Sequence, residues 1–91
     1  MPIIYQTFKP GEARITAAIV TDSGMADILV YLTGNRGMAR DEAHWFITDK
    51  RNEYATKIYF GSIGFSDLNV SFTTHIGKAG WQKDHRLKGK L

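Results

Sequence analysis

Short runs of β-forming residues recur along the chain, and a small residue precedes each run. Turn-rich segments separate the runs, which begin at Ala13, Ala26, Ala43, Ala55, Ser66 and Ala79. Apolar and polar side chains alternate in SDLNVSFT (66–73), as on a half-buried strand, whereas ILVYL (28–32) is apolar on both faces and should be central. The sequence therefore predicts a β-rich α+β domain, with a single sheet of about five to six short strands and short helical turns.

The spacing of the runs restricts how their strands can be connected. Successive runs begin 11 to 17 residues apart, which leaves about six residues for a typical connection once the strand itself is counted. Parallel neighbours in a sheet usually need a crossover of a dozen or more residues. We therefore expect consecutive strands to be antiparallel hairpins or else not to be direct neighbours, and the residues leave both arrangements open.

Length and composition indicate one domain in the whole chain of 91 residues. We divide it into an N-terminal extension or first strand (1–12), a core built from the runs (13–81) and a basic tail (82–91). The absence of cysteine excludes disulfides, thiolate metal sites and cysteine nucleophiles, and suits a reducing cytoplasm. The first residues, MPIIYQTFKPGE, lack the pattern of a signal peptide or a membrane span, so we expect a cytoplasmic protein without membrane partners.

The letters DEAH at residues 41–44 match the box that couples a nucleotide's magnesium to hydrolysis in helicases. That box requires a phosphate-binding loop of the form G-x-x-x-x-G-K-[ST]. Here the Gly-Lys pairs at 77–78 and 89–90 are followed by alanine and leucine, so the loop is missing. We therefore expect no nucleotide and no other cofactor, and we interpret Asp41 and Glu42 as solvated loop acids before a strand that contains Trp45.

The remaining polar residues do not form a recognisable catalytic or metal-binding motif. The three histidines, His44, His75 and His85, lack metal-ligand spacing, so no metal site is expected. A small hydrolase is kept as one alternative, because its residues can converge in space. The residues that it would use are Ser62 or Ser66 with His75 and Asp67. The acid pairs Glu42 and Asp49, or Asp22 and Asp27, are interpreted as loop acids that cap turns.

The basic excess of the chain lies at its C-terminal end. Residues 78–91 carry five basic residues and one acid, whereas residues 1–77 carry seven and eight. The tail is therefore a candidate contact for nucleic acid or an acidic protein face. The candidate residues are Lys78, Lys83, Arg86, Lys88 and Lys90. Two other readings stay open, namely a solvated tail, or a tail in which Arg86 and Leu87 fold back to lock the final strand.

The ordered series of runs resembles the repeats of the septoil-knot family of small bacterial domains. The segment SDLNVSFTTHIGKAGW (66–81) is similar to that family's closing repeat, which ends in Ala-Gly-Trp before a basic tail. The segments ADILVYLT (26–33), DEAHWFIT (41–48) and KIYF (57–60) resemble its earlier repeats, although Ser66 and Ser71 depart from the pattern. The resemblance implies a backbone tied in a deep knot with seven crossings. It implies no enzymatic activity, substrate or cofactor.

Taken together, these features favour a non-enzymatic small soluble binding or accessory domain with a macromolecular partner. The alternatives are a binder of nucleic acid or another polyanion through the basic tail, and a small hydrolase. Trp45 and Trp81 each sit among apolar neighbours in a run, so we expect both to pack in the core, with Trp81 at the base of the tail. The sequence leaves the oligomeric state and the identity of the partner undetermined.

Overall fold

The computed structural model describes residues 2–50 and 54–91. Within them lie seven strands and four single-turn 3₁₀ helices, and the helical turns expected from the sequence are of this type. The strands are β1 (Ile3–Gln6), β2 (Ile15–Ile19), β3 (Ile28–Leu32), β4 (His44–Thr48), β5 (Thr56–Phe60), β6 (Leu68–Thr73) and β7 (Gly80–Trp81). The helices are η1 (Pro10–Glu12), η2 (Ser23–Met25), η3 (Arg36–Met38) and η4 (Ile76–Lys78).

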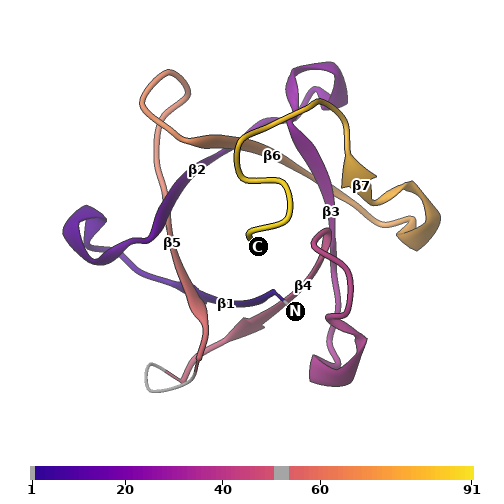
Figure 1. Ribbon diagram of the computed structural model, residues 1–91, viewed down its shortest axis with the longest axis horizontal. Coiled ribbons are helices and arrows are strands. Elements are labelled where there is room, and N and C mark those ends of the chain that lie inside the picture. The colour runs from indigo at the N-terminus through magenta and orange to yellow at the C-terminus, as the bar shows by residue number, and fades with distance from the viewer. Residues whose placement is uncertain (1, 51–53) are drawn as a thin grey trace.

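Six of the strands form a closed parallel barrel, which Figure 1 shows along its axis. Their order is β4-β1-β5-β2-β6-β3, and β3 pairs with β4 to close the circle. All six barrel pairings are parallel, and β7 adds to the first half of β3 in antiparallel orientation. The predicted β-rich domain of short strands is confirmed, but the prediction of a single sheet of about five to six strands did not include its closure into a barrel. Closure depends on which distant strands pair, and no local sequence pattern specifies that.

Consecutive strands are mostly not neighbours in the barrel, which resolves the problem set by the short connections. β5 lies between β1 and β2, β6 between β2 and β3, β1 between β4 and β5, and β2 between β5 and β6. The step from β3 to β4 is the exception, because these consecutive strands are parallel neighbours, contrary to the prediction. From β1 to β6 the chain passes around the barrel about one and a half times, and the second pass fills the gaps left by the first. Residues 3–6, an extension or a first strand in the sequence, form β1 in the barrel wall.

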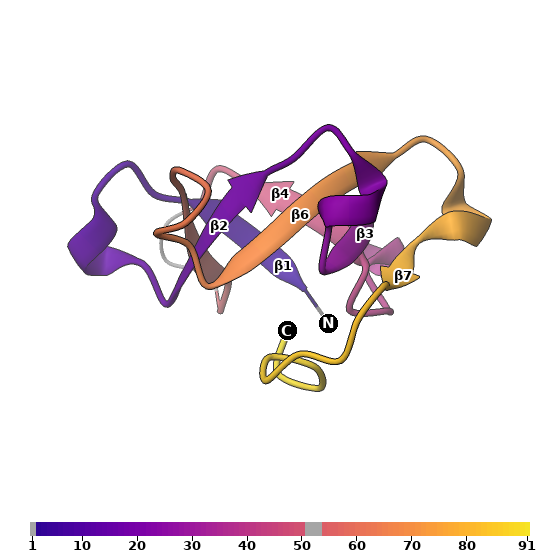
Figure 2. The same cartoon turned by 90° about the horizontal axis from the view of Figure 1, so that it is seen from above.

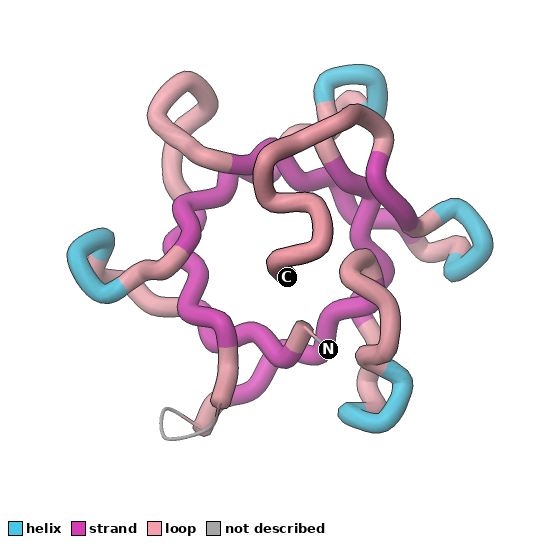
Figure 3. The backbone as a smooth tube through the Cα atoms, viewed as in Figure 1, coloured by secondary structure: helices cyan, strands magenta, loops and turns pink. Residues whose placement is uncertain are grey.

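The four 3₁₀ connections share one local design and project outward as lobes (Figure 3). Each helix has glycine at its middle position and is followed by an alanine whose N–H donates to the carbonyl of the first helical residue. These pairs are Gly11 and Ala13, Gly24 and Ala26, Gly37 and Ala39, and Gly77 and Ala79. Ala26 and Ala39 are fully buried, so a larger side chain there would press on the barrel wall. This explains why small residues precede the strands.

The core fills the inside of the barrel. The inward side chains alternate along each strand, and the largest of them that are fully buried are Trp45, Ile4, Ile28, Ile58, Leu68, Val30 and Val70. Trp45 is therefore a core residue, as predicted, whereas Trp81 is only half-buried at the edge of the core. The prediction that ILVYL is central is confirmed, because β3 pairs with β4, β6 and β7.

Because the barrel strands run parallel, the two ends of the barrel differ. We call the end at which the six strands finish the open end, and the end at which they begin the covered end. Figure 2 shows residues 82–91 lying across the covered end. The open end has no such segment of the described chain across it. Both ends collect side chains from segments far apart in the sequence.

Candidate functional site

Six side chains, one from each barrel strand, surround the opening at the open end. They line a cavity of about 220 Å³ and are Gln6, Ile19, Leu32, Ile47, Phe60 and Phe72. Each continues the inward alternation of its strand beyond the buried core, as Phe72 does after Leu68 and Val70. Ile19, Leu32, Ile47 and Phe72 are 52, 45, 40 and 37% exposed. We call these six residues the apolar mouth, because large apolar side chains converge there in contact with solvent.

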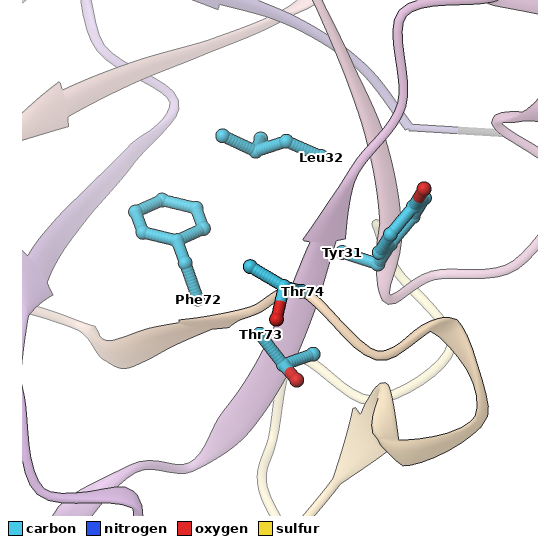
Figure 4. A pocket seen from close by; sticks show the side chains of 5 residues that line it. All are labelled: Tyr31, Leu32, Phe72, Thr73 and Thr74. Carbon is cyan, nitrogen blue, oxygen red and sulfur yellow. The ribbon is translucent and has the colours of Figure 1, made fainter.

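A groove adjoins the apolar mouth between the ends of β3 and β6. Its cavity of about 360 Å³ is lined by Tyr31, Leu32, Phe72, Thr73 and Thr74, which Figure 4 shows from close by. Leu32 and Phe72 line both cavities, so the mouth and the groove are continuous. Tyr31, Thr73 and Thr74 add hydroxyl groups to the lining of this groove.

The mouth rests on the rigid core and lacks acid–base chemistry. The ring of Phe72 meets the buried ring of Trp45 edge-on, with centroids 6.4 Å apart and an interplanar angle of 80°. Gln6 is the polar residue among the six that line the mouth, and none of the six titrates. Parallel barrel enzymes place their catalytic groups at the end where the strands finish. Here the same end is suited to apolar recognition.

Glu42 organises the covered end. Its carboxylate accepts hydrogen bonds from the Trp81 Nε1–H (3.0 Å) and from the backbone N–H groups of Gly89 (2.8 Å) and Leu91 (2.8 Å). Its backbone carbonyl accepts from the Nε1–H of Trp45 at 2.7 Å. Burial raises the pKa of Glu42, but the donors from Leu91, Gly89 and Trp81 outweigh that effect, so its pKa lies below the ordinary value. The interpretation of Glu42 as a solvated loop acid was wrong.

Two aspartates hold the tail from other sides of the covered end. Asp67 accepts from Arg86 Nη2 at 2.8 Å, and Asp27 Oδ2 lies 3.7 Å from His85 Nε2. Each aspartate also accepts a backbone N–H from a neighbouring strand: Asp67 from Thr16 at 3.2 Å, and Asp27 from Asn69 at 2.8 Å.

Apolar contacts complete the attachment of the tail. Leu87 and Leu91 are partly buried and pack against the core cluster. The His85 ring stacks on Trp81 with centroids 5.8 Å apart. The tail therefore follows the reading in which Arg86 and Leu87 fold back against the barrel, rather than that of a freely solvated segment.

The five candidate anion contacts have different surroundings. Arg86 is engaged with Asp67, and Lys88 Nζ lies 4.0 Å from Asp84 Oδ1. Lys83, Lys88 and Lys90 are exposed on the tail, and Lys78 is exposed in the last turn of η4. The lysines thus remain accessible to an anionic partner, whereas Arg86 has a structural role.

The residues of the hydrolase alternative are not brought together. Ser66 Oγ donates to the backbone carbonyl of Ser62 at 2.9 Å, and Asp67 is occupied by Arg86. The six residues of β6 separate Asp67 from His75, a span of about 20 Å at the usual rise of a strand. Asp67 lies at the covered end and His75 beyond the open end, so they cannot act as a pair.

The acid pairs and the histidines are also dispersed. β4 lies between Glu42 and Asp49, while Asp22 caps η2 by accepting from the Gly24 N–H. His44 meets Tyr31 edge-on, with centroids 6.2 Å apart. Across residues 2–50 and 54–91, no three His, Asp or Glu side chains are grouped so that they could hold a metal ion.

The fold defines a class of small barrel, in which six parallel strands close the barrel and one antiparallel strand is added to it. The chain belongs to the 7(1) septoil knot domain family, whose model matches residues 1–82. The resemblance seen in the sequence is thereby confirmed. No curated protein and no solved structure matches the chain. None of the helices in the described part is long and apolar enough to cross a membrane.

Sequence reasoning missed the apolar mouth and the role of Glu42, and it predicted the helical turns without recognising the pattern that marks them. The apolar mouth requires the strand register, although the alternation in 66–73 already placed Phe72 on the face of Leu68 and Val70. The Gly-x-Ala pattern at 11–13, 24–26, 37–39 and 77–79 was a visible signal for the 3₁₀ connections. The role of Glu42 had no local signal, because the backbone groups that it binds lie 47 and 49 residues further along the chain.

Proposed function

We propose that the protein is a non-enzymatic cytoplasmic binding domain whose apolar mouth receives an apolar side chain of a protein partner. One observation carries this proposal: four large apolar side chains from four strands converge at the open end and stay partly exposed. Contiguous exposed apolar surface on a folded domain marks an interaction site more often than scattered apolar residues do. The absence of cysteine supports the cytoplasmic location.

The mouth and its adjoining groove together suit the surface of a protein partner. The mouth itself is a cavity of about 220 Å³. It can hold one leucine or phenylalanine side chain, and full burial of such a side chain contributes about 1.5–3 kcal/mol. The groove beside it, with the hydroxyls of Tyr31, Thr73 and Thr74, supplies the polar rim that surrounds the apolar centre of protein interfaces.

We further propose that the chain forms the seven-crossing knot of its family and that the knot keeps the mouth in one shape. The passage of the chain about one and a half times around the barrel supports this proposal. Threading must bring distant segments of the chain together before their contacts stabilise the fold. Refolding from denaturant should therefore be slow. A slow refolding phase that a prolyl isomerase does not accelerate is expected. Complete refolding within milliseconds would contradict the knot.

Photo-crosslinking in the cells that express the protein tests the proposed binding site. The photoreactive residue p-benzoylphenylalanine replaces Phe72 at the mouth or, as a matched control, the exposed Phe65 in the β5–β6 connection. We expect a discrete protein adduct from position 72 and none from position 65, and its loss when Leu32→Lys is added. Identical adducts from both positions, or an adduct that survives Leu32→Lys, would overturn the proposal.

A second function, the binding of nucleic acid or another polyanion, is supported by the exposed lysines of the tail. Lys83, Lys88 and Lys90 lie on a segment whose Arg86, Leu87 and Leu91 are fixed to the barrel. Three phosphate contacts on duplex DNA would give a slope of log affinity against log salt of about −2.7. Replacing all three lysines with glutamine should remove that slope. A salt response that is flat in the wild type, or unchanged in the variant, would exclude this function.

A further inference from the structure

The covered end of the barrel has the features of a receptor with a bound peptide. Glu42 accepts the backbone N–H groups of Gly89 and Leu91, two alternate residues of the same segment. These contacts recognise main chain, and any residue except proline can make them. Here a side-chain carboxylate binds backbone donors, as in the recognition of a peptide ligand. Paired strands of a sheet instead bond backbone to backbone.

Side chains of the same segment add charge and shape to this recognition. Arg86 meets Asp67 and His85 faces Asp27, so a basic pair lies opposite two acids. Leu87 and Leu91, four residues apart, pack on the core. The arrangement therefore selects two neighbouring basic residues followed by two leucines with a spacing of four.

The segment is held by side-chain contacts and not by backbone pairing with the barrel strands. Beyond Gln82, whose N–H donates to the carbonyl of Asp27, the backbone–backbone hydrogen bonds seen among the described residues are internal: Lys88 to His85 and Lys90 to Leu87. The Arg86 and Asp67 side chains are 66 and 43% exposed, and ion pairs of that exposure contribute about 0–1 kcal/mol. The family match ends at residue 82, so the segment that covers this end lies outside the matched domain.

We propose that the covered end is a peptide-binding site for a short cationic segment of another protein with two leucines four residues apart. Residues 85–91 occupy this site from the same chain and exchange with such a segment. The site is distinct from the apolar mouth, which lies at the opposite end of the barrel. Its ligand chemistry follows from charge complementarity at Asp27, Asp67 and Glu42, and from the leucine contacts already in place.

A competition experiment with the full-length chain tests the proposal. The probe is a fluorescent synthetic peptide, QKDHRLKGKL, which reproduces residues 82–91. The variant L87S/L91S weakens the attached segment and leaves the receptor residues intact. Because an attached segment competes at an effective concentration of the order of millimolar, we expect the variant to bind the peptide at least tenfold more tightly than the wild type.

Two controls define specificity. A peptide with both leucines replaced by serine should bind the L87S/L91S chain at least tenfold more weakly. Adding Glu42→Gln to that chain should weaken binding of the original peptide by a similar factor. Equal binding of both peptides, or no effect of Glu42→Gln, would overturn the proposal. Concentration-dependent dimers that do not bind the free peptide would also contradict it, since a second copy would then be the occupant.

The wild-type chain provides a second measurement if the double variant does not fold. In NMR spectra, millimolar unlabelled peptide should shift the amide resonances of Gly89 and Leu91 toward those of a released segment. The amide of Thr33, which donates to the carbonyl of Trp45 toward the open end, serves as the control. Gly89 and Leu91 resonances that do not move at saturating peptide would contradict exchange.

Discussion

The two ends of the barrel are built from the same six strands, yet they have opposite chemistry. The open end presents Ile19, Leu32, Ile47 and Phe72 to solvent, whereas the covered end places Asp27, Glu42 and Asp67 beneath a cationic segment. The difference follows from strand direction. Backbone N–H groups near the starts of parallel strands need acceptors, and Asp27 and Asp67 supply them to Asn69 and Thr16. A parallel barrel therefore has two chemically different ends, and we propose that the two ends of this chain have different tasks.

The largest effect should come from the core that supports both ends. Trp45 is fully buried and packs beneath Phe72, while its Nε1–H donates to the Glu42 carbonyl. Trp45→Ala should lower the free energy of unfolding by about 3–5 kcal/mol, as measured by urea denaturation. Trp81→Ala should cost less, because that ring is only half-buried. Equal costs would contradict the assignment of Trp45 to the core and of Trp81 to its edge.

An intermediate effect is expected from the receptor at the covered end. Glu42→Gln removes the charge that receives three N–H donors, and a hydrogen bond to a charged group contributes about 1.5–3 kcal/mol. The amides of Gly89 and Leu91 should then exchange with solvent at least tenfold faster, with the core amides unchanged. The matched control is Asp41→Asn, because Asp41 is exposed and bonds only locally to the Ala43 N–H. Similar exchange in both variants would remove Glu42 from its assigned role.

The covered end should also respond to acid, whereas the open end should not. The pKa of Glu42 is lowered below 4.5 in the folded chain. Its charge therefore contributes stability above the unfolded pKa, and this contribution is lost as the pH falls through the folded pKa. Amide exchange at Gly89 and Leu91 should accelerate below about pH 4.5, after correction for intrinsic rates. The Glu42→Gln chain should lack this dependence; if it keeps it, another group controls the segment.

The smallest effect on stability should come from the apolar mouth. Leu32 is 45% exposed, so Leu32→Lys should change the free energy of unfolding by less than about 1 kcal/mol. Val30→Ala, one inward position deeper and fully buried, is the control and should cost more. Thermal denaturation of the two variants measures the contrast. A larger loss for Leu32→Lys would show that the mouth serves stability rather than binding.

The strands were predictable from sequence to the extent that their signals are local. The apolar run ILVYL coincides with β3, and the alternation in 66–73 contains β6. The spacing of the runs left two arrangements open, namely antiparallel hairpins or consecutive strands that are not direct neighbours. The pairing of β2 with β5 and β6 shows that the second arrangement holds for β2. Barrel closure was not predictable, because it depends on pairs such as Tyr31 with His44 whose register no single strand contains.

The candidate sites were less predictable than the strands. The tail was identified by its charge, and Arg86 and Leu87 were named as residues that fold back, but Glu42, which accepts from Gly89 and Leu91 of the same tail, was assigned to solvent. In the sequence, a loop carboxylate that is hydrated by water cannot be distinguished from one that accepts hydrogen bonds from residues nearly fifty positions away. The apolar mouth likewise arises when single side chains from six strands meet, so each strand contributes only one ordinary residue to the sequence, apolar in every case except Gln6.

The yield of the photo-adduct from position 72, compared between Leu32→Lys and Glu42→Gln backgrounds, tests the assignment of partner binding to the open end most directly. The two substitutions alter opposite ends of the barrel, and both chains are expected to remain folded. We predict that Leu32→Lys abolishes the adduct and that Glu42→Gln leaves its yield within twofold of the unsubstituted chain. An adduct that survives Leu32→Lys and disappears with Glu42→Gln would contradict the account.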